Sequence, residues 1–207
     1  MTLDFSGPGL WYATRAAGLV TLLLLTASVL LGVLTAGRFA SPRWPRFLTA
    51  GLHRNLSLLA LAFVVLHVGT TVLDSYTSIQ LSAAFIPFIS GYKRIWLGLG
   101  AIALDLLIAV LATSLLRTRL GYRAWRLVHW CGYACWPVAV AHGAGAGTDS
   151  RTSWAAAMTV GCVAAVAAAV AWRLLQRWPE RRVLRLSLMS AAAVGVPAAL
   201  SLSGYHW

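Results

Sequence analysis

Histidine is the residue type in this chain most able to do chemistry, because four of its five histidines fall within two predicted membrane helices. An ionisable side chain inside a membrane is costly to place and commonly marks a functional site. Neutral imidazole is also a common metal ligand. The four residues are His53 and His67 on the helix predicted over residues 47–73, and His129 and His142 on the helix predicted over residues 124–143.

The spacing of these histidines fits two helices that present imidazoles at two depths. Fourteen residues separate the first pair, roughly 3.9 turns, so both imidazoles face the same direction on their helix. Thirteen residues separate the second pair, roughly 3.6 turns, and Pro137 between them can kink or rewind that helix. The axial separation within each helix is about 20 Å, which places one imidazole level in each leaflet.

Two imidazole pairs at two depths are the ligand set that two haems require. His53 and His129 both lie near the arginine-rich ends of their helices, whereas His67 and His142 both lie near the opposite ends. Haem iron takes one imidazole on each face of the porphyrin, and a slot between parallel helices provides that geometry. The chain has no C-x-x-C-H motif for covalent attachment, so we predict two non-covalent b-type haems between the second and fourth helices. The alternative for any single histidine is a buried, hydrogen-bonded structural residue.

The composition indicates that lipid surrounds much of this chain. Hydrophobic residues make up 59% of the 207 positions and charged residues only 11%, which is more apolar surface than a soluble domain of this length can bury. Each apolar run is about 20 residues long, enough to cross a hydrocarbon core of roughly 30 Å. We therefore predict an all-α integral membrane fold, a single domain over residues 1–207. Its six transmembrane helices are predicted over residues 11–36, 47–73, 95–116, 124–143, 153–173 and 183–203.

The basic residues are concentrated in alternate connections between the predicted helices. Most of the 17 Lys and Arg residues lie in the first, third and fifth connections, and few lie on the other side. The positive-inside rule places these connections in the cytoplasm and both termini outside. The net charge of +12 is thus explained by topology and lipid headgroups, and we expect no nucleic acid partner. Arginine far outnumbers lysine, which is typical of a high-GC bacterium, so we expect a multi-pass protein of the bacterial cytoplasmic membrane.

Three motifs around the histidines resemble one known group of membrane proteins. They are the 14- and 13-residue histidine spacings, the run LGYRAWRLVHW at 120–130 and the run HGAGAGTD at 142–149. Together they resemble the ferric-reductase-like transmembrane domain superfamily, and the resemblance covers residues 11–173. The group includes the membrane domains of NADPH oxidases and ferric reductases, and the haem subunit of the bacterial methionine sulfoxide reductase system.

The resemblance assigns the ligands in pairs. It implies that His53 and His129 ligate the cytoplasmic-side haem, and that His67 and His142 ligate the outer haem. The C-terminal FAD and NADPH modules of the oxidases and ferric reductases have no counterpart in this sequence. The chain therefore looks closer to small bacterial di-haem members that work with separate redox partners.

We accordingly expect an electron-transfer subunit in which no catalytic residue is assigned. Its donor would be a cytoplasmic flavoprotein, such as a flavin reductase, or a membrane quinol, and its acceptor an extracytoplasmic protein, for example a flavin-binding one. Flavin or quinone would enter only through these partners. Two alternatives stay open: a quinone-reactive cytochrome b subunit that takes electrons inward from an external dehydrogenase, and a haem-free transporter or structural membrane protein.

Three further charged residues are candidates for roles near the haems. Arg54 and Arg126 flank the inner histidine pair and could neutralise haem propionates, although snorkelling to the interface explains them equally well. Asp105 lies near the middle of the helix predicted over residues 95–116, an expensive place for a carboxylate. It could relay protons, hydrogen-bond a ligating imidazole or hold helices together.

Overall fold

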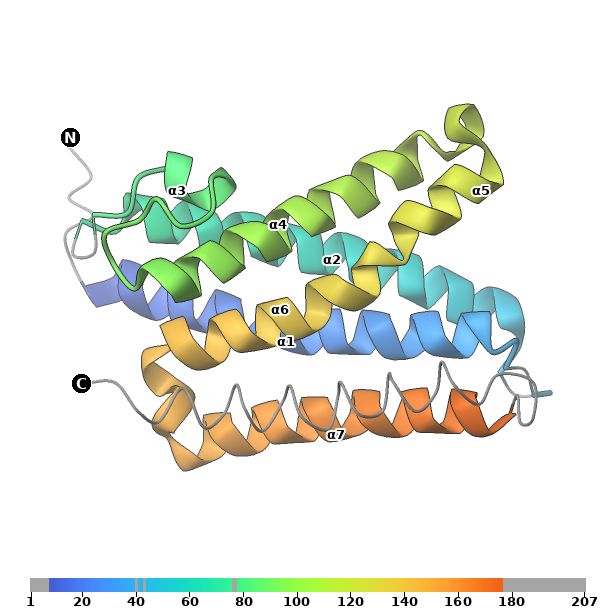
Figure 1. The fold of residues 1–207 in the computed structure, drawn as a ribbon. Coiled ribbons are helices and arrows are strands. Elements are labelled where there is room, and N and C mark those ends of the chain that lie inside the picture. The colour runs from blue at the N-terminus through green and yellow to red at the C-terminus, as the bar shows by residue number, and fades with distance from the viewer. Residues whose placement is uncertain (1–7, 40, 43, 76–77, 177–207) are drawn as a thin grey trace. The chain divides into compact units, whose positions relative to one another are not determined.

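The computed structural model describes residues 8–39, 41–42, 44–75 and 78–176, and within these ranges the chain is helical with no strand (Figure 1). A short helix, α3, lies in the long connection before α4, and one 3₁₀ turn, η1, precedes the last described helix. The elements are α1 Pro8–Ala36, α2 Arg46–Leu73, α3 Ser82–Phe85, α4 Arg94–Leu115, α5 Arg117–His129, α6 Cys131–Ala146, η1 Thr148–Arg151 and α7 Ser153–Gln176.

Four of these helices are long and apolar enough to cross a membrane, which makes the chain a multi-pass membrane protein. They confirm the first, second, third and fifth predicted helices to within a few residues. The predicted helix over residues 183–203 lies outside the described residues. The four spans are Gly9–Ala36, Arg46–Leu73, Arg94–Leu115 and Ser153–Leu175.

The helix predicted over residues 124–143 is instead two helices, α5 and α6, which meet at Trp130. Its first half is the arginine-rich α5, which at 13 residues is too short to cross a hydrocarbon core by itself. Within α5, Gly121 has a φ of 76°, a left-handed value that interrupts the helix and that glycine adopts most easily. Trp130 at the junction is 60% exposed, whereas Trp136 inside α6 is buried. The sequence placed both tryptophans inside one helix.

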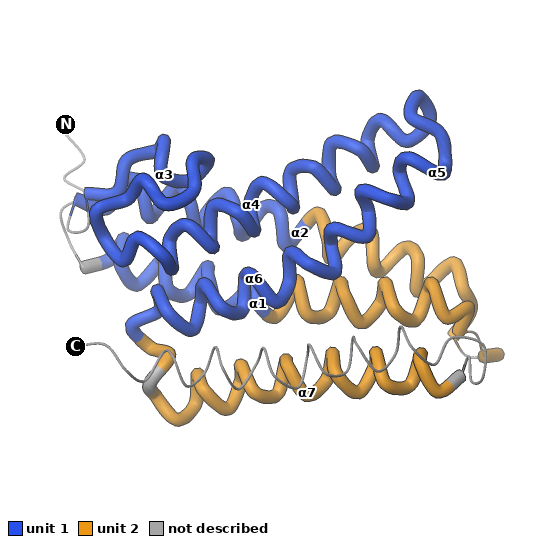
Figure 2. The backbone as a smooth tube through the Cα atoms, in the orientation of Figure 1, with its two compact units in different colours: residues 1–22, 59–148 blue, residues 23–58, 149–207 orange. Residues whose placement is uncertain are grey.

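The chain divides into two compact units, and α1 and α2 contribute residues to both (Figure 2). Unit 1 is Met1–Leu22 with Leu59–Thr148, and unit 2 is Leu23–Leu58 with Asp149–Trp207. In unit 1, α4 packs along α6 and against α3. Lys93, just before α4, ties the start of α4 to the end of α6. Its Nζ donates to the carbonyl oxygens of Gly145 and Ala146, both at 3.2 Å.

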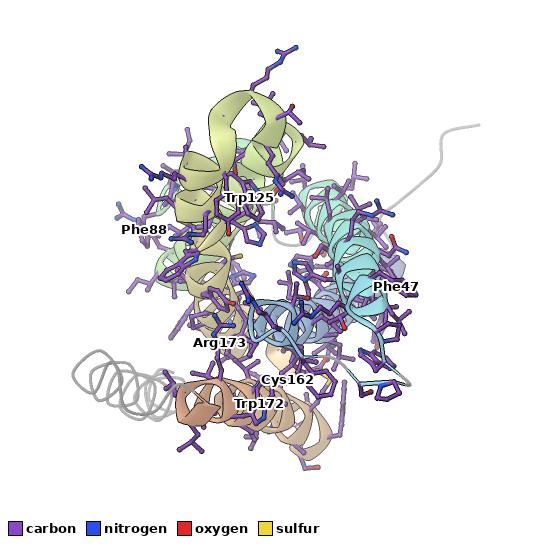
Figure 3. The ribbon with its side chains drawn as sticks, turned by 90° about the vertical axis from the view of Figure 1, so that its right-hand side faces the viewer. Phe47, Phe88, Trp125, Cys162, Trp172 and Arg173 are labelled. Atoms are coloured by element: carbon purple, nitrogen blue, oxygen red, sulfur yellow. The ribbon has the colours of Figure 1, made fainter. Side chains whose placement is uncertain are left out.

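Unit 2 contains the second half of α1, the first half of α2, and α7. The end of α7 contacts the end of α1 through the two adjacent residues labelled in Figure 3, Trp172 and Arg173. The Trp172 ring lies against Gly37, where a Cβ would be only 3.2 Å from it. Arg173 Nη1 donates to the carbonyl oxygen of Val33 at 3.2 Å. These contacts hold the two helix ends together at one end of the unit.

Candidate imidazole-pair site

Two of the predicted site residues, His67 and His142, lie next to each other within unit 1. His67 comes from α2 and His142 from α6, and they are 75 residues apart in the sequence by their numbers. Their ring centroids are 6.2 Å apart and the ring planes make an angle of 77°. The structure therefore brings together the pair that the sequence predicted for the outer site.

Each imidazole of this pair is held by a backbone carbonyl on a neighbouring helix. His67 Nδ1 donates to the carbonyl oxygen of Thr14 on α1 at 2.8 Å. His142 Nδ1 donates to the carbonyl oxygen of Trp96 on α4, also at 2.8 Å. A carbonyl oxygen can only accept, so the proton must sit on Nδ1. In the neutral ring this leaves Nε2 with its lone pair available as a metal ligand.

The two rings are close enough that both could bind one metal ion. Their centroids are 6.2 Å apart, which leaves room for metal–nitrogen bonds of roughly 2.0 Å from both Nε2 atoms. Among the described residues no group of three or more His, Cys, Asp or Glu side chains could hold a metal. Histidine imidazole is a common ligand of haem iron, and this pair supplies two imidazoles whose Nδ1 atoms are both engaged elsewhere. The residues present thus fit a haem.

His53 lies in unit 2 and its surroundings resemble those of His67. Its Nδ1 donates to the carbonyl oxygen of Ser28 on α1 at 2.9 Å, and the Ser28 hydroxyl is 3.3 Å from the same nitrogen. The Ser28 hydroxyl also bonds to the hydroxyl of Ser57 at 2.7 Å, one helical turn after His53. His53 therefore has its Nδ1 engaged by a backbone carbonyl, as His67 and His142 do.

His129, the fourth predicted ligand, lies in unit 1 at the end of α5, where a tryptophan one turn earlier stacks on it. The rings of Trp125 and His129 are 4.8 Å apart and 24° from parallel. Trp125 Nε1 donates to the hydroxyl of Ser114 at 3.3 Å, and the Arg117 guanidinium lies 4.6 Å from the Trp125 ring centroid. Figure 3 labels Trp125 among the side chains of this unit. Trp125 was not predicted as a site residue, although it precedes His129 by four residues, a spacing that brings two side chains together on a helix.

The charged candidates lie at the surface of the described structure. Arg54 and Arg126 are both exposed, and the Arg126 guanidinium lies 5.6 Å from the ring of Tyr122. Asp105 is also exposed. It follows Gly100 by five residues on α4, about 140° around the helix, so it is on a different face from the one that His142 contacts. The Nδ1 atoms of His67 and His142 bond to backbone carbonyls and not to this carboxylate.

Comparison with known proteins gives one family match. The family described as "Ferric reductase like transmembrane component" matches residues 17–140, which is more than half of the chain. No curated protein and no solved structure matches the chain. The matched range contains three of the four candidate histidines, and His142 follows it by two residues.

Proposed function

The chain belongs to the family of ferric reductase like transmembrane components, and we propose that it is a di-haem b-type cytochrome that carries electrons across the cytoplasmic membrane. The family membership establishes a membrane protein of redox type. The two haems, their ligands and the direction of transfer are the proposal.

The observation that carries the proposal is the adjacent pair of His67 and His142. Their separation of 6.2 Å would let both residues hold one haem iron, and both Nδ1 atoms are engaged by carbonyls, which leaves both Nε2 atoms to ligate. A hydrogen bond from the distal nitrogen to a carbonyl fixes the ring orientation and raises the basicity of the ligating nitrogen. The haem, when bound, supplies a one-electron redox centre.

For the inner site we propose His53 and His129 as the ligands. His53 has the same carbonyl-engaged Nδ1 as the outer pair, and His129 is oriented by its stacking on Trp125. Arg54 and Arg126 are exposed beside these histidines in the sequence, and we propose them as counter-charges for the inner propionates.

The distribution of charge suggests where the partners meet the chain. We propose that the arginine-rich α5 faces the cytoplasm, with both termini outside, and that a cytoplasmic flavin reductase or a membrane quinol delivers electrons on the α5 side. The acceptor would then be an extracytoplasmic protein, for example a flavin-binding one, on the side of His67 and His142. The exposed apolar residues of α2 and α4 face lipid.

The stoichiometry of haem tests the proposed function directly. We expect purified wild-type protein to carry about two non-covalent b haems per chain, since two histidine pairs are available. A pyridine haemochrome assay against the protein concentration gives this ratio, and acid–acetone extraction should remove all of the haem. A folded, colourless protein from haem-replete cells would contradict the proposal and favour a transporter or structural role. A single haem per chain would show that one of the two histidine pairs does not bind haem.

A second expectation concerns Trp125. Trp125→Ala removes both the stacking on His129 and the contact with Arg117, which together contribute about 1–2 kcal/mol. We expect a lower melting temperature and a shifted electron paramagnetic resonance signal from the inner haem, because His129 loses the ring that orients it. The outer haem signal should not change.

Trp125→Phe is the matched control, because it keeps an aromatic ring against His129 but removes the Nε1 bond to Ser114. It should retain most of the wild-type inner-haem signal. Equal inner-haem spectra in the Ala, Phe and wild-type proteins would show that the stacking has no part in orienting His129.

A further inference from the structure

Three of the four histidines lie in the same local arrangement, although they contact three different stretches of helix. In each case a backbone carbonyl at position i accepts from the imidazole Nδ1, and a glycine at position i+4 lies against the imidazole ring. We call this arrangement the cradle. The three cradles are Thr14 and Gly18 with His67, Ser28 and Gly32 with His53, and Trp96 and Gly100 with His142.

The i, i+4 spacing has a physical reason. A helix carbonyl at i already accepts from the N–H at i+4 and keeps one lone pair for a second donor. Side chains on a helix tilt toward its N-terminus, so the side chain at i+4 covers that carbonyl. With glycine at i+4 the carbonyl is open, and an imidazole can approach it closely enough to donate.

The imidazoles occupy the space that a side chain at the glycine would fill. A Cβ on Gly100 would lie 2.7 Å from Cε1 and Nδ1 of His142, closer than real contacts allow. A Cβ on Gly18 would lie 3.1 Å from Cε1 of His67, and one on Gly32 would lie 3.4 Å from Cε1 of His53. The space for a Cβ therefore differs among the three glycines: it is lacking at Gly100, tight at Gly18 and nearly sufficient at Gly32.

On α1 the cradle is repeated, together with a second feature. The Thr14 hydroxyl donates to the Thr70 hydroxyl at 2.8 Å, and the Ser28 hydroxyl bonds to the Ser57 hydroxyl at 2.7 Å. Each of these α2 partners follows its histidine by about one turn. Thr14 and Ser28 are 14 residues apart, the same spacing as the two histidines that they hold. Helix α1, which carries no histidine, thus has two copies of one holding device.

The fourth histidine is held differently. On α4, the position 14 residues after Gly100 is Ser114, and its hydroxyl donates to the carbonyl oxygen of Val110 at 2.6 Å. The carbonyl at i is therefore covered by the side chain at i+4, and Ser114 accepts from Trp125, which stacks on His129.

From this pattern we propose that Gly18, Gly32 and Gly100 are positioning residues that hold the haem-ligating histidines in the Nδ1–H form with a fixed ring orientation. This inference rests on the proposed function. It makes α1 and α4 part of the haem sites although neither contributes a ligand. Replacing a cradle glycine with alanine should push the imidazole away from its carbonyl, and so weaken haem binding and lower the basicity of the ligating nitrogen.

The chain offers a matched control for each cradle glycine. Gly143 is adjacent to His142, Gly69 follows His67 by two residues, and Gly51 precedes His53 by two, and a Cβ on any of them would meet nothing within 4 Å. The experiment compares three pairs of alanine variants in the full-length detergent-purified chain. The pairs are Gly100→Ala with Gly143→Ala, Gly18→Ala with Gly69→Ala, and Gly32→Ala with Gly51→Ala.

Three quantities are measured: haem per polypeptide, the low-spin ferric signals in electron paramagnetic resonance, and the midpoint potential of each haem. We expect Gly100→Ala to lower the affinity for the outer haem by about 10-fold or more, the usual effect of losing a partner of a metal ligand. Gly18→Ala should have a smaller effect on the same haem. Gly18→Ala should also shift the signal of that haem and move its potential in the positive direction, whereas Gly32→Ala should have the smallest effect of the three, because its Cβ would lie 3.4 Å from the His53 ring.

The controls and Gly18→Ala keep the test decisive. The three control variants should match wild type in all three quantities. If Gly100→Ala fails to fold, the milder Gly18→Ala still decides the matter, because its Cβ would lie 3.1 Å from the His67 ring and a merely structural glycine would not move a potential or a paramagnetic signal. Gly100→Ala and Gly18→Ala variants that match their controls in a haem-loaded protein would overturn this inference alone. A wild-type chain without haem would overturn the proposed function as well.

Discussion

The variant His142→Ala is expected to leave the purified chain with about one haem in place of two. His142 provides one of the two imidazoles whose ring centroids lie 6.2 Å apart, and alanine has no atom that can replace Nε2 as a ligand. The variant also loses the bond from Nδ1 to the Trp96 carbonyl, which orients the ring at this site. The haem-to-protein ratio and the loss of one paramagnetic signal measure the result.

Two companion variants sharpen this result. His67→Ala removes the opposite ligand and should lose the same signal, because both imidazoles serve one iron. When cells that express His142→Gly are grown with added imidazole, the variant should regain part of the lost paramagnetic signal. The free imidazole can enter the space that the side chain leaves. Gly143→Ala, one residue away, should keep both haems. If His67→Ala and His142→Ala removed different signals, the two histidines would belong to different haems.

Much of the membrane fold was predictable, because a helix that crosses a membrane must be about 20 residues long and mostly apolar. The predictions for α1, α2, α4 and α7 agree with the structure to within a few residues. The prediction of one helix over residues 124–143 was wrong in its continuity. Apolar and aromatic residues lie on both sides of Trp130, and hydropathy does not report where one helix ends and the next begins.

The sequence also predicted that His67 and His142 would pair, because depth matching on two helices puts them at one level, and the structure brings these two rings together. It could not predict how they are held. The acceptors are main-chain carbonyls, which every residue has, so no side-chain pattern marks Thr14 or Trp96. Only the glycines one turn after these acceptors can be recognised in the sequence. A glycine in a membrane helix is common for other reasons, such as close helix packing.

For the inner histidines the structure adds surroundings that pattern alone did not give. Ser28 and Ser57 lie in apolar stretches, where the sequence gives them no special role. In the structure the Ser28 carbonyl oxygen accepts from His53 Nδ1, and the Ser28 and Ser57 hydroxyls bond to each other. Trp125 reads as an interfacial aromatic residue, and its stacking on His129 depends on the local course of α5. The pairing of His53 with His129 stays a prediction.

Electron transfer across a sealed membrane gives the second large effect. We expect wild-type protein in vesicles to pass electrons from reduced flavin outside to ferricyanide enclosed inside, and both His142→Ala and His129→Ala to reduce this transfer to the rate of protein-free vesicles. The reason is that the two histidine levels on one helix are about 20 Å apart, so each pair can hold only one of two centres that act in series. Neither centre alone spans the hydrocarbon core of roughly 30 Å.

The two variants should differ in what remains possible. In protein molecules whose α5 side is exposed to the donor, the remaining inner haem of His142→Ala should still be reduced. The enclosed ferricyanide should stay oxidised. In His129→Ala the same donor should leave the outer haem oxidised, because the inner centre between them is missing. Stopped-flow spectra of oriented vesicles distinguish these outcomes, with Gly143→Ala as the control that keeps both haems. Wild-type transfer to the enclosed acceptor by a His142→Ala protein shown to lack its outer haem would rule out a series relay, because one centre would then suffice for the whole crossing.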